Sequence, residues 1–344
     1  MIKSVKFLLA LLFQGFCLYA TAQTTEPTFK TDSIADKMLT YQLSNGAWPK
    51  QLIDKSVVSY KKPITPALME IIKATDEMHA TIDNSATTRE INALVKAFKT
   101  TGNKSYLQAA EKGIDYLLKA QYKNGGWPQY YPDKSSYRAE ITYNDNAIIN
   151  VLNIMLDIVR QSNGFDVVNI NYIAKADNAV KRGLDCILKT QIVQGDKLSI
   201  WAAQYDQNTL KPAKARNFEP ASLSTSESVN IVKFLMRIDQ PSLPVKQAIK
   251  NAVQWFDNAK IKGFKFEKMA NGDKGLIADV NAVIWARFHD INTNKPIFGD
   301  RDNSIKDNVA DISFERRNNY AWYGDWAVGL IQKDYPKWLK ILGE

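Results

Sequence analysis

The spacing of apolar residues along this chain predicts a series of amphipathic helices. Apolar residues recur every three or four positions in residues 106–122, and the same spacing returns in residues 180–191. Further apolar runs that favour helices lie at 93–98, 148–159, 229–235 and directly after 279–281. No sustained alternation of apolar and polar residues marks a large sheet. We therefore predict an all-α fold.

One motif recurs where these helices end. QLSNGAWP at 42–49 returns as QYKNGGWP at 121–128, and a degraded third copy begins at Gln191. Gly and Pro in the motif stop a helix, and a polar helix start follows downstream, at 82–84, 144–146 and 224–227. Units of this length predict repeated helical hairpins, arranged as an (α/α)3 toroid. The polar helix starts would converge on one face, where we expect the cleft.

The N-terminus has the pattern of a signal peptide. A short basic region precedes a mostly apolar run, and Ala-Thr-Ala at 20–22 fits a cleavage site. The apolar run is too short to cross a bilayer, so we expect no stable membrane insertion. We therefore predict a signal peptide at 1–22, a single catalytic toroid domain at 23–344, and a secreted or periplasmic protein. We expect this protein to be a monomer, without an internal disulfide because Cys186 is the only cysteine after residue 22.

Charge and histidine content narrow the function. The net charge is +9, and removal of Lys3 and Lys6 with the signal peptide leaves +7. A basic exported protein favours an acidic polysaccharide as partner, rather than nucleic acid. Only His79 and His289 are present, and no G-x-S-x-G turn occurs. Nucleophilic catalysis by a Ser-His or Cys-His pair is therefore poorly supported.

Two polar helix starts contain carboxylate and amide residues in matching places. Asp83-Asn84 precedes one predicted helix, and Asp145-Asn146 precedes the next. Asp and Asn are favoured N-caps, so capping alone explains one residue in each pair. The sequence at 144–146, however, supplies three such residues. Clustered carboxylate and amide oxygens also suit Ca²⁺, so a calcium site and a pair of caps both remain open.

Several aromatic and arginine residues are candidates for substrate contact. Q-x-x-x-G-x-W motifs hold helices together in terpene-cyclase barrels, so the motif has a structural interpretation. Alternatively, Trp127 and its neighbouring tyrosines form a platform on which sugars stack. Arg216 lies among aromatic and carboxylate residues, a setting that usually holds an anion. Arg287 and Arg301 lie in loop-like or helix-end sequence, where each is either salt-bridged or available to grip a carboxylate.

Several long segments together resemble the pectate lyases of polysaccharide lyase family 10. The resemblance covers nearly all of residues 41–323. It is carried by QLSNGAWPK at 42–50, TIDNSATTREI at 81–91, NGGWPQYYP at 124–132, ITYNDNA at 141–147, WAAQYDQNTLKPAKARNFEPAS at 201–222, WARFHDINTNKPIFGDRD at 285–302 and ERRNNYAWY at 315–323. It implies an (α/α)3 toroid and calcium-dependent β-elimination of polygalacturonate.

The resemblance also implies roles for individual residues. Arg216 matches the arginine that serves as the base, and Asp145 and Asp83 match positions that bind calcium or substrate. Arg301 is implied as a contact to a substrate carboxylate and Arg287 as a weaker one. Asn84, Asn146 and Trp127 complete the predicted substrate site. Asn146 replaces a second aspartate found in many relatives, which puts the strength of the calcium site in question.

Two other functions remain open from the residues alone. One is a toroid glycoside hydrolase that acts on uronates, with Asp83 and Asp145 as acid and base. The other is a non-catalytic protein that binds polyuronates.

An arginine base predicts activity that peaks well above neutral pH, because the reference pKa of arginine exceeds 12.

Overall fold

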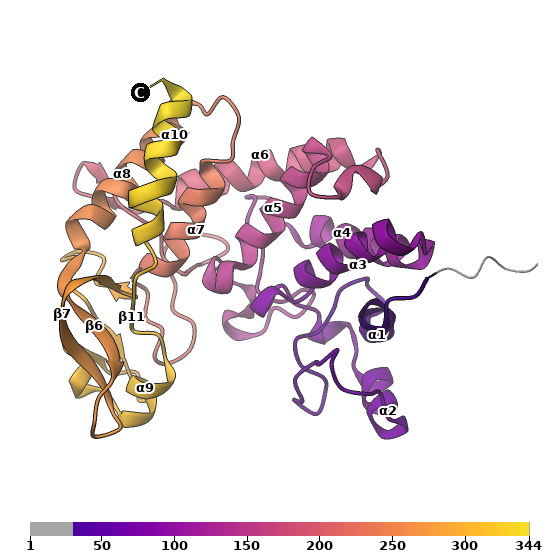
Figure 1. Ribbon diagram of the computed structural model, residues 1–344, viewed down its shortest axis with the longest axis horizontal. Helices are drawn as coiled ribbons and strands as arrows, with labels where there is room; N and C mark the ends of the chain where they lie inside the picture. The colour runs from indigo at the N-terminus through magenta and orange to yellow at the C-terminus, as the bar shows by residue number, and fades with distance from the viewer. Residues whose placement is uncertain (1–29, 344) are drawn as a thin grey trace, which may run out of the picture.

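The computed structural model of the chain describes residues 30–343. The signal peptide predicted at 1–22 lies outside the described residues. Three helical hairpins form the centre of the described part, as Figure 1 shows. They are α3 (Thr88–Thr101) with α4 (Lys104–Ala120), α5 (Ala147–Arg160) with α6 (Tyr172–Thr190), and α7 (Thr225–Leu235) with α8 (Leu243–Ala259). Helix α5 contacts both α3 and α7, so the hairpins follow one another in space as they do in the sequence.

The recurring sequence motif connects one hairpin to the next. Gln121 follows α4, and its side-chain amide donates hydrogen bonds of 3.0 Å to the carbonyls of Gly125 and of Ala179 on α6. Gln42 makes the same pair of bonds to Gly46 and to α4, and Gln191 makes them to Ser199 and to α8. Each glutamine therefore fixes its own turn and the following outer helix. This confirms the stapling interpretation of the motif.

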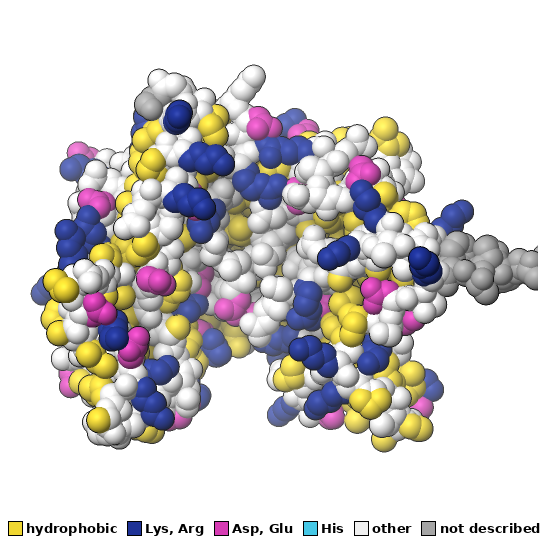
Figure 2. Space-filling view, in the orientation of Figure 1, with side chains coloured by type: hydrophobic (Ala, Val, Ile, Leu, Met, Phe, Trp, Pro, Cys, Tyr) yellow, Lys and Arg dark blue, Asp and Glu magenta, His cyan; other side chains and the backbone are white. Residues whose placement is uncertain are grey.

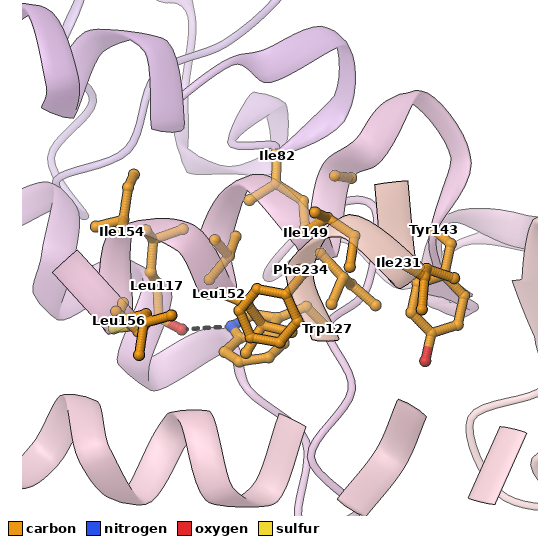
Figure 3. Close-up of a cluster of buried hydrophobic side chains, with 14 of the residues drawn as sticks. Ile82, Leu117, Trp127, Tyr143, Ile149, Leu152, Ile154, Leu156, Ile231 and Phe234 are labelled. Carbon is orange, nitrogen blue, oxygen red and sulfur yellow. Dashed lines mark hydrogen bonds between the residues drawn. The ribbon is translucent and has the colours of Figure 1, made fainter. Parts of the chain in front are cut away.

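The motif tryptophans anchor the apolar core. Trp127 is fully buried, and its indole N–H donates a 2.7 Å hydrogen bond to the carbonyl of Leu117. Figure 3 shows this bond beside apolar side chains of α5 and α7, among them Leu152 and Phe234. Trp48 and Trp201 occupy equivalent places after α1 (Ser33–Tyr41) and α6. The apolar positions that predicted the helices thus meet in one core.

The C-terminal part of the chain forms a sheet, so the predicted all-α toroid is wrong. Strands β6 (Ile261–Lys268) and β7 (Lys274–Ala286) form a long antiparallel hairpin, and β11 (Tyr323–Gly324) pairs with the other edge of β7. The helix predicted after 279–281 is instead the second half of β7. Asn271-Gly272 closes the hairpin turn, and an Asn-Gly pair is a strong hairpin signal that outweighs a short apolar run.

Smaller elements complete the described chain. The remaining helices are α2 (Pro66–Ala74), α9 (Phe314–Asn319) and α10 (Tyr335–Leu342). Short antiparallel pairs join β1 (Ile141–Thr142) to β4 (Gln204–Tyr205), β2 (Val193–Gln194) to β3 (Lys197–Leu198), β5 (Leu223–Ser224) to β8 (Phe288–His289), and β9 (Phe298–Gly299) to β10 (Ile305–Lys306). Among the described residues, no helix has the length and apolar character needed to cross a membrane.

Candidate active site

Two short acidic turns lie side by side at the starts of the central helices. The turn Asp83–Ser85 precedes α3, the turn Asn144–Asn146 precedes α5, and the two turns contact each other. Asn84, Asp145 and Asn146 have φ angles of 49°, 52° and 61°, in the left-handed region. Asn and Asp tolerate this region better than other side chains, but it still costs free energy, and such strain concentrates at functional sites.

The acidic side chains of these turns do not cap the helices. The residues at the N-cap positions of α3 and α5 are Thr87 and Asn146, and neither makes a side-chain capping bond. The main chain holds the turns instead. Thr81 donates its hydroxyl to the carbonyl of Gln129 at 2.6 Å, and the amides of Tyr143 and Asn144 both donate to the carbonyl of Ala203. Neither carboxylate caps a helix, which removes the capping interpretation for Asp83 and Asp145.

A cavity of about 180 Å³ brings four of the eight predicted site residues together. We call it the central cavity, and it is lined by Lys50, Asp83, Asn84, Gln129, Tyr137, Asn144, Asp145, Gln204, Arg216 and Glu219. Four of the predicted residues, Asp83, Asn84, Asp145 and Arg216, are in this set. The expected convergence of the polar helix starts on one face is therefore confirmed for the first two hairpins.

The two aspartates of the central cavity differ in their surroundings. Asp83 is buried and forms an ion pair with the ammonium of Lys50 through Oδ2, while its Oδ1 accepts a 3.0 Å bond from the backbone amide of Asn84. Burial lowers the pKa of Lys50, but the adjacent Asp83 charge raises it further, so the net shift is upward. Asp145 is open to the cavity. Desolvation and then the Asp83 charge raise its pKa.

Arg216 is held by a buried carboxylate. Its guanidinium binds both carboxylate oxygens of Glu219, with a distance of 2.8 Å from Nε to Oε2, and Tyr320 donates a 3.0 Å bond to the same carboxylate. Hydrogen bonding to Glu219 raises the pKa of Arg216. Burial would raise the pKa of Glu219, but the hydrogen bonds and charge of Arg216 lower it. In this state both groups are firmly ionised.

Arg216 belongs to a group of three arginines around the ring of Phe218. The guanidinium carbons of Arg216, Arg301 and Arg316 lie 4.8, 5.5 and 4.3 Å from the ring centroid. We call these three residues the arginine cluster. Glu315 pairs with both Arg301 and Arg316. Arg216 and Arg301 also line a second hollow of about 480 Å³, so the positive charge extends beyond the central cavity.

Three predicted substrate contacts lie elsewhere. Arg287 is buried, and its guanidinium forms an ion pair with Glu227 at 2.5 Å, so its charge reaches Asp145 only at longer range. Asn146 is half-buried and is not among the residues that line the central cavity. The sugar-stacking role predicted for Trp127 is wrong, because the ring has no exposed surface and its N–H is bonded within the core.

The recurring motif also marks three residues of the central cavity that were not predicted. Lys50 and Gln129 both lie two residues after the tryptophan of their motif copy, and both line the central cavity. Gln204 lies three residues after the tryptophan of the third copy and lines it too. Because the buried tryptophan fixes the backbone, the residue two or three positions later is directed to the same place in each repeat. The position relative to the motif tryptophan therefore identifies Lys50, Gln129 and Gln204 as residues of the central cavity.

The donor set of the central cavity fits a hard cation. The carboxylates of Asp83 and Asp145 and the amide oxygens of Asn84 and Gln129 face one space, and Gln129 Oε1 is buried with no hydrogen-bond partner in the described chain. Oxygen donors of this kind suit Ca²⁺. No group of three or more His, Cys, Asp or Glu side chains is gathered for a metal among residues 30–343. A cation held here needs amides, water or a ligand's own oxygens to complete its shell.

The scaffold consists of helical hairpins, and its cleft combines two acidic turns with the arginine cluster. This arrangement fits a protein that binds an anionic ligand. Figure 2 shows the molecular face as two lobes separated by a deep notch, with Lys and Arg side chains gathered along one edge. Comparison with known proteins assigns the family. A family model described as pectic acid lyase matches residues 42–331, so the chain belongs to the pectic acid lyase family and is a pectate lyase.

Two solved structures support this assignment. The family 10 polysaccharide lyase from Cellvibrio cellulosa is 31% identical, with a TM-score of 0.79, over 90% of this chain and 92% of that chain. A mutant of that lyase in complex with trigalacturonic acid is 32% identical, with a TM-score of 0.81, over 91% and 93% of the two chains. No curated protein matches the chain. The assignment confirms the family and enzyme class expected from the sequence and argues against the hydrolase and the binding protein.

Proposed function

We propose that this pectate lyase is a secreted, calcium-dependent enzyme that cleaves polygalacturonate by β-elimination, with Arg216 as the base that removes the C5 proton. The observation that supports the proposal is the central cavity of about 180 Å³, which is lined by Arg216, Asp83 and Asp145. A related lyase has been solved with trigalacturonic acid, which supports the same acidic polymer as substrate.

The proposed division of labour follows from charge. In galacturonan the C5 proton lies next to the C6 carboxylate, so its removal builds negative charge beside a negative group. When bound, Ca²⁺ supplies positive charge that stabilises this build-up. Asp83 and Asp145 would hold the ion, with amide oxygens such as that of Gln129. Arg301 would bind a substrate carboxylate and orient C5 toward Arg216, which takes the C5 proton. The C4–O bond then breaks to leave a 4,5-unsaturated sugar, and the departing oxygen takes up a proton from water.

The ion pair with Glu219 constrains the role of Arg216. A base must be neutral when it accepts the proton, and the carboxylate of Glu219 opposes deprotonation because it raises the pKa of Arg216. Proton removal therefore requires Arg216 to leave Glu219, or requires nearby cations to offset that carboxylate. Lys50, Arg301 and the bound ion supply such positive charge. An Arg216 that stayed in this ion pair throughout turnover would only clamp an anion, which is the alternative role.

One assay tests the calcium-dependent elimination. The mature protein is incubated with polygalacturonate with and without EDTA, and the ultraviolet absorbance of the unsaturated product is followed. We expect the absorbance to rise with time, the rise to stop when EDTA is added, and the rise to resume with excess Ca²⁺. Product without this absorbance would contradict elimination, and absorbance that is indifferent to EDTA would contradict the calcium requirement.

A second assay separates the two roles of Arg216. Arg216→Lys keeps the positive charge but changes the proton affinity and the fork geometry. If Arg216 is the base, the Arg216→Lys variant should still bind trigalacturonate, but its turnover should fall by about a hundredfold or more. Near-normal turnover would overturn the base role. Arg317→Lys is the matched control, because Arg317 pairs with Asp273 and is not among the residues that line the central cavity.

Export rests on the pattern at residues 1–22 and is part of the proposal. Expression of the full chain in a bacterial host with a secretory pathway tests it. We expect the mature protein outside the cytoplasm, with an N-terminus near residue 23. Uncleaved protein in the cytoplasm would contradict export and would leave the proposed chemistry untouched.

A further inference from the structure

A polar groove lies on the helical surface next to the central cavity. It has a volume of about 460 Å³, and it is lined by Ser85, Thr88, Arg89, Asn92, Asn150, Asn153, Ile154 and Asp157, which come from the first acidic turn, α3 and α5. We call it the amide groove. The proposed chemistry makes no use of this surface.

The asparagines of the amide groove lie in helix interiors, where their type is unfavourable. Of the 14 residues of α5, ten are buried, and the helix is otherwise strongly apolar. Asn150 and Asn153 are partly exposed and share one helix face with Asp157, at spacings of three and four residues. Each asparagine costs roughly 0.5 kcal/mol of helix propensity relative to alanine. Asparagines kept at this cost indicate a surface that binds a ligand through hydrogen bonds to their side-chain amides.

The amide groove carries little uncompensated charge. Arg237 on the neighbouring segment binds Asn153 Oδ1 and forms an ion pair with Asp157 at 2.6 Å. Arg89 pairs with Glu90 on its other side. The groove therefore differs from the central cavity, where the arginine cluster and Lys50 present positive charge. A uronate carboxylate finds no dedicated partner among the amides.

Each asparagine keeps a polar group for a ligand. Asn92 and Asn150 donate through Nδ2 to the carbonyl of Thr88 at 2.8 Å and to the hydroxyl of Ser85 at 3.2 Å. Their Oδ1 atoms, and Nδ2 of Asn153, have no hydrogen-bond partner in the described chain. The groove thus offers acceptors, a donor and the hydroxyls of Ser85 and Thr88. Sugar hydroxyls, which both donate and accept, match this mixture.

We propose that the amide groove binds an uncharged, hydroxyl-rich saccharide unit of the polymer that the central cavity cleaves. The two sites are neighbours, because Ser85 follows Asn84 of the central cavity and Arg89 also lines the space beside Lys50 and Asn84. The inference rests on the proposed function for the idea of a shared polymer. No aromatic side chain lines the groove within residues 30–343. Binding therefore relies on hydrogen bonds and should be weak, with a Kd on the order of 1 mM.

Binding experiments with defined probes test the inference. The double variant Asn92→Ala/Asn150→Ala removes two ligand-facing amides, and alanine favours the helix, so the fold is retained. Saturation-transfer NMR titrations use three probes: β-1,4-galactotetraose, the trimethyl ester of trigalacturonate, and trigalacturonate itself. The first two are uncharged and separate a neutral sugar from an esterified uronate as the source. Asn251→Ala, on the exposed surface of α8, is the matched control.

We expect at least one uncharged probe to bind the native protein and to lose about fivefold or more in affinity in the double variant. Trigalacturonate should bind both proteins equally, through the central cavity. Absence of binding by both uncharged probes, or equal binding to the native protein and the double variant, overturns the inference. Weaker binding of trigalacturonate to the variant also overturns it, because the groove would then hold charged units. Loss of lyase activity on polygalacturonate alone would instead reject the proposed function.

Discussion

At the scale of single residues, the ion pairs of the central cavity decide how the site works. Asp83 and Arg216, two of the residues singled out from the sequence, are each engaged by a partner that was not, Lys50 and Glu219. Asp83 and Arg216 were predicted because they lie in segments that resemble the family. Lys50 was missed because its pairing with Asp83 depends on the approach of segments 33 residues apart in sequence. Glu219 lies only three residues after Arg216, but its burial arises from packing that no local pattern shows. The site residues were predictable, but their resting state was not.

Lys50 would compete with the proposed Ca²⁺ for Asp83. Its ammonium already neutralises that buried carboxylate, so a cation entering the central cavity must displace it. Lys50→Met keeps much of the side-chain volume and removes the competing charge. We expect calcium affinity without substrate, measured by isothermal titration calorimetry, to rise about tenfold. Lys99→Met, which loses an exposed pair with Asp166, should leave the affinity unchanged. Unchanged or weaker calcium binding by Lys50→Met would show that Lys50 does not compete.

Glu219 sets the proton affinity of Arg216. Glu219→Gln removes the charge that raises the pKa of Arg216 and keeps a group able to accept one hydrogen bond. Because Arg216 is half-exposed, the shift is screened, and we expect the acidic limb of the pH profile of kcat/KM to move down by about one unit. Glu315→Gln, which affects Arg301 and Arg316 only, serves as the control. An unmoved profile would exclude Arg216 as the titrating base.

At the scale of elements, the repeats were predictable and the sheet was not. Helices appeared where apolar residues recur every three or four positions, because one face of each helix enters the core. In β7 the burial pattern alternates only in part, since much of this long strand is exposed. Its apolar residues near 283–285 therefore resembled the start of a helix. Asn271-Gly272 was the local cue that distinguished a hairpin from a helix.

The glutamine of the motif stabilises the junction between hairpins. Gln121→Ala leaves the buried carbonyls of Gly125 and Ala179 without their shared donor. Each unsatisfied group costs roughly 1–3 kcal/mol, so we expect the free energy of unfolding to fall by about 2–4 kcal/mol. Urea denaturation followed by circular dichroism measures this loss. Gln254→Ala removes an exposed bond within α8 and should change stability little. A comparable loss in both variants would reject a special role for the motif.

At the scale of the whole molecule, the family was recognisable from sequence because its long segments supply the central cavity and its staples. Most of these segments are turns, not helices: 81–91, 141–147 and 201–222 contain the acidic turns and the Arg216 loop. Their geometry depends on exact residue types, as the left-handed Asn84 and Asp145 illustrate. The fold class was missed because the sheet carries few of these segments. The described chain thus joins a scaffold of repeated helical hairpins to a sheet whose residues follow a different hydrophobic pattern.

The junction between sheet and hairpins makes stability depend on pH through His289. This residue on β8 is buried with Nδ1 unpartnered among the described residues, and its ring meets Trp255 of α8 edge-on, with centroids 5.0 Å apart. Burial lowers its pKa from 6.5 to about 4. Between these values the unfolded chain binds a proton that the folded protein does not. Stability is therefore fully present above pH 6.5 and falls by about 3 kcal/mol as the pH drops to 4.

His289→Phe should remove this contribution, because phenylalanine keeps the contact with Trp255 and cannot be protonated. Free energies of unfolding are measured at pH 7 and at pH 4.5 for the native protein, for His289→Phe and for His79→Phe, which alters the other histidine, near the surface. Carboxylates also titrate in this range, so the comparison is between the drops and not between absolute values. We expect the drop to be smaller by about 2–3 kcal/mol only in His289→Phe. An equal drop in all three proteins would mean that His289 is charged in the folded state or that its surroundings open before it titrates.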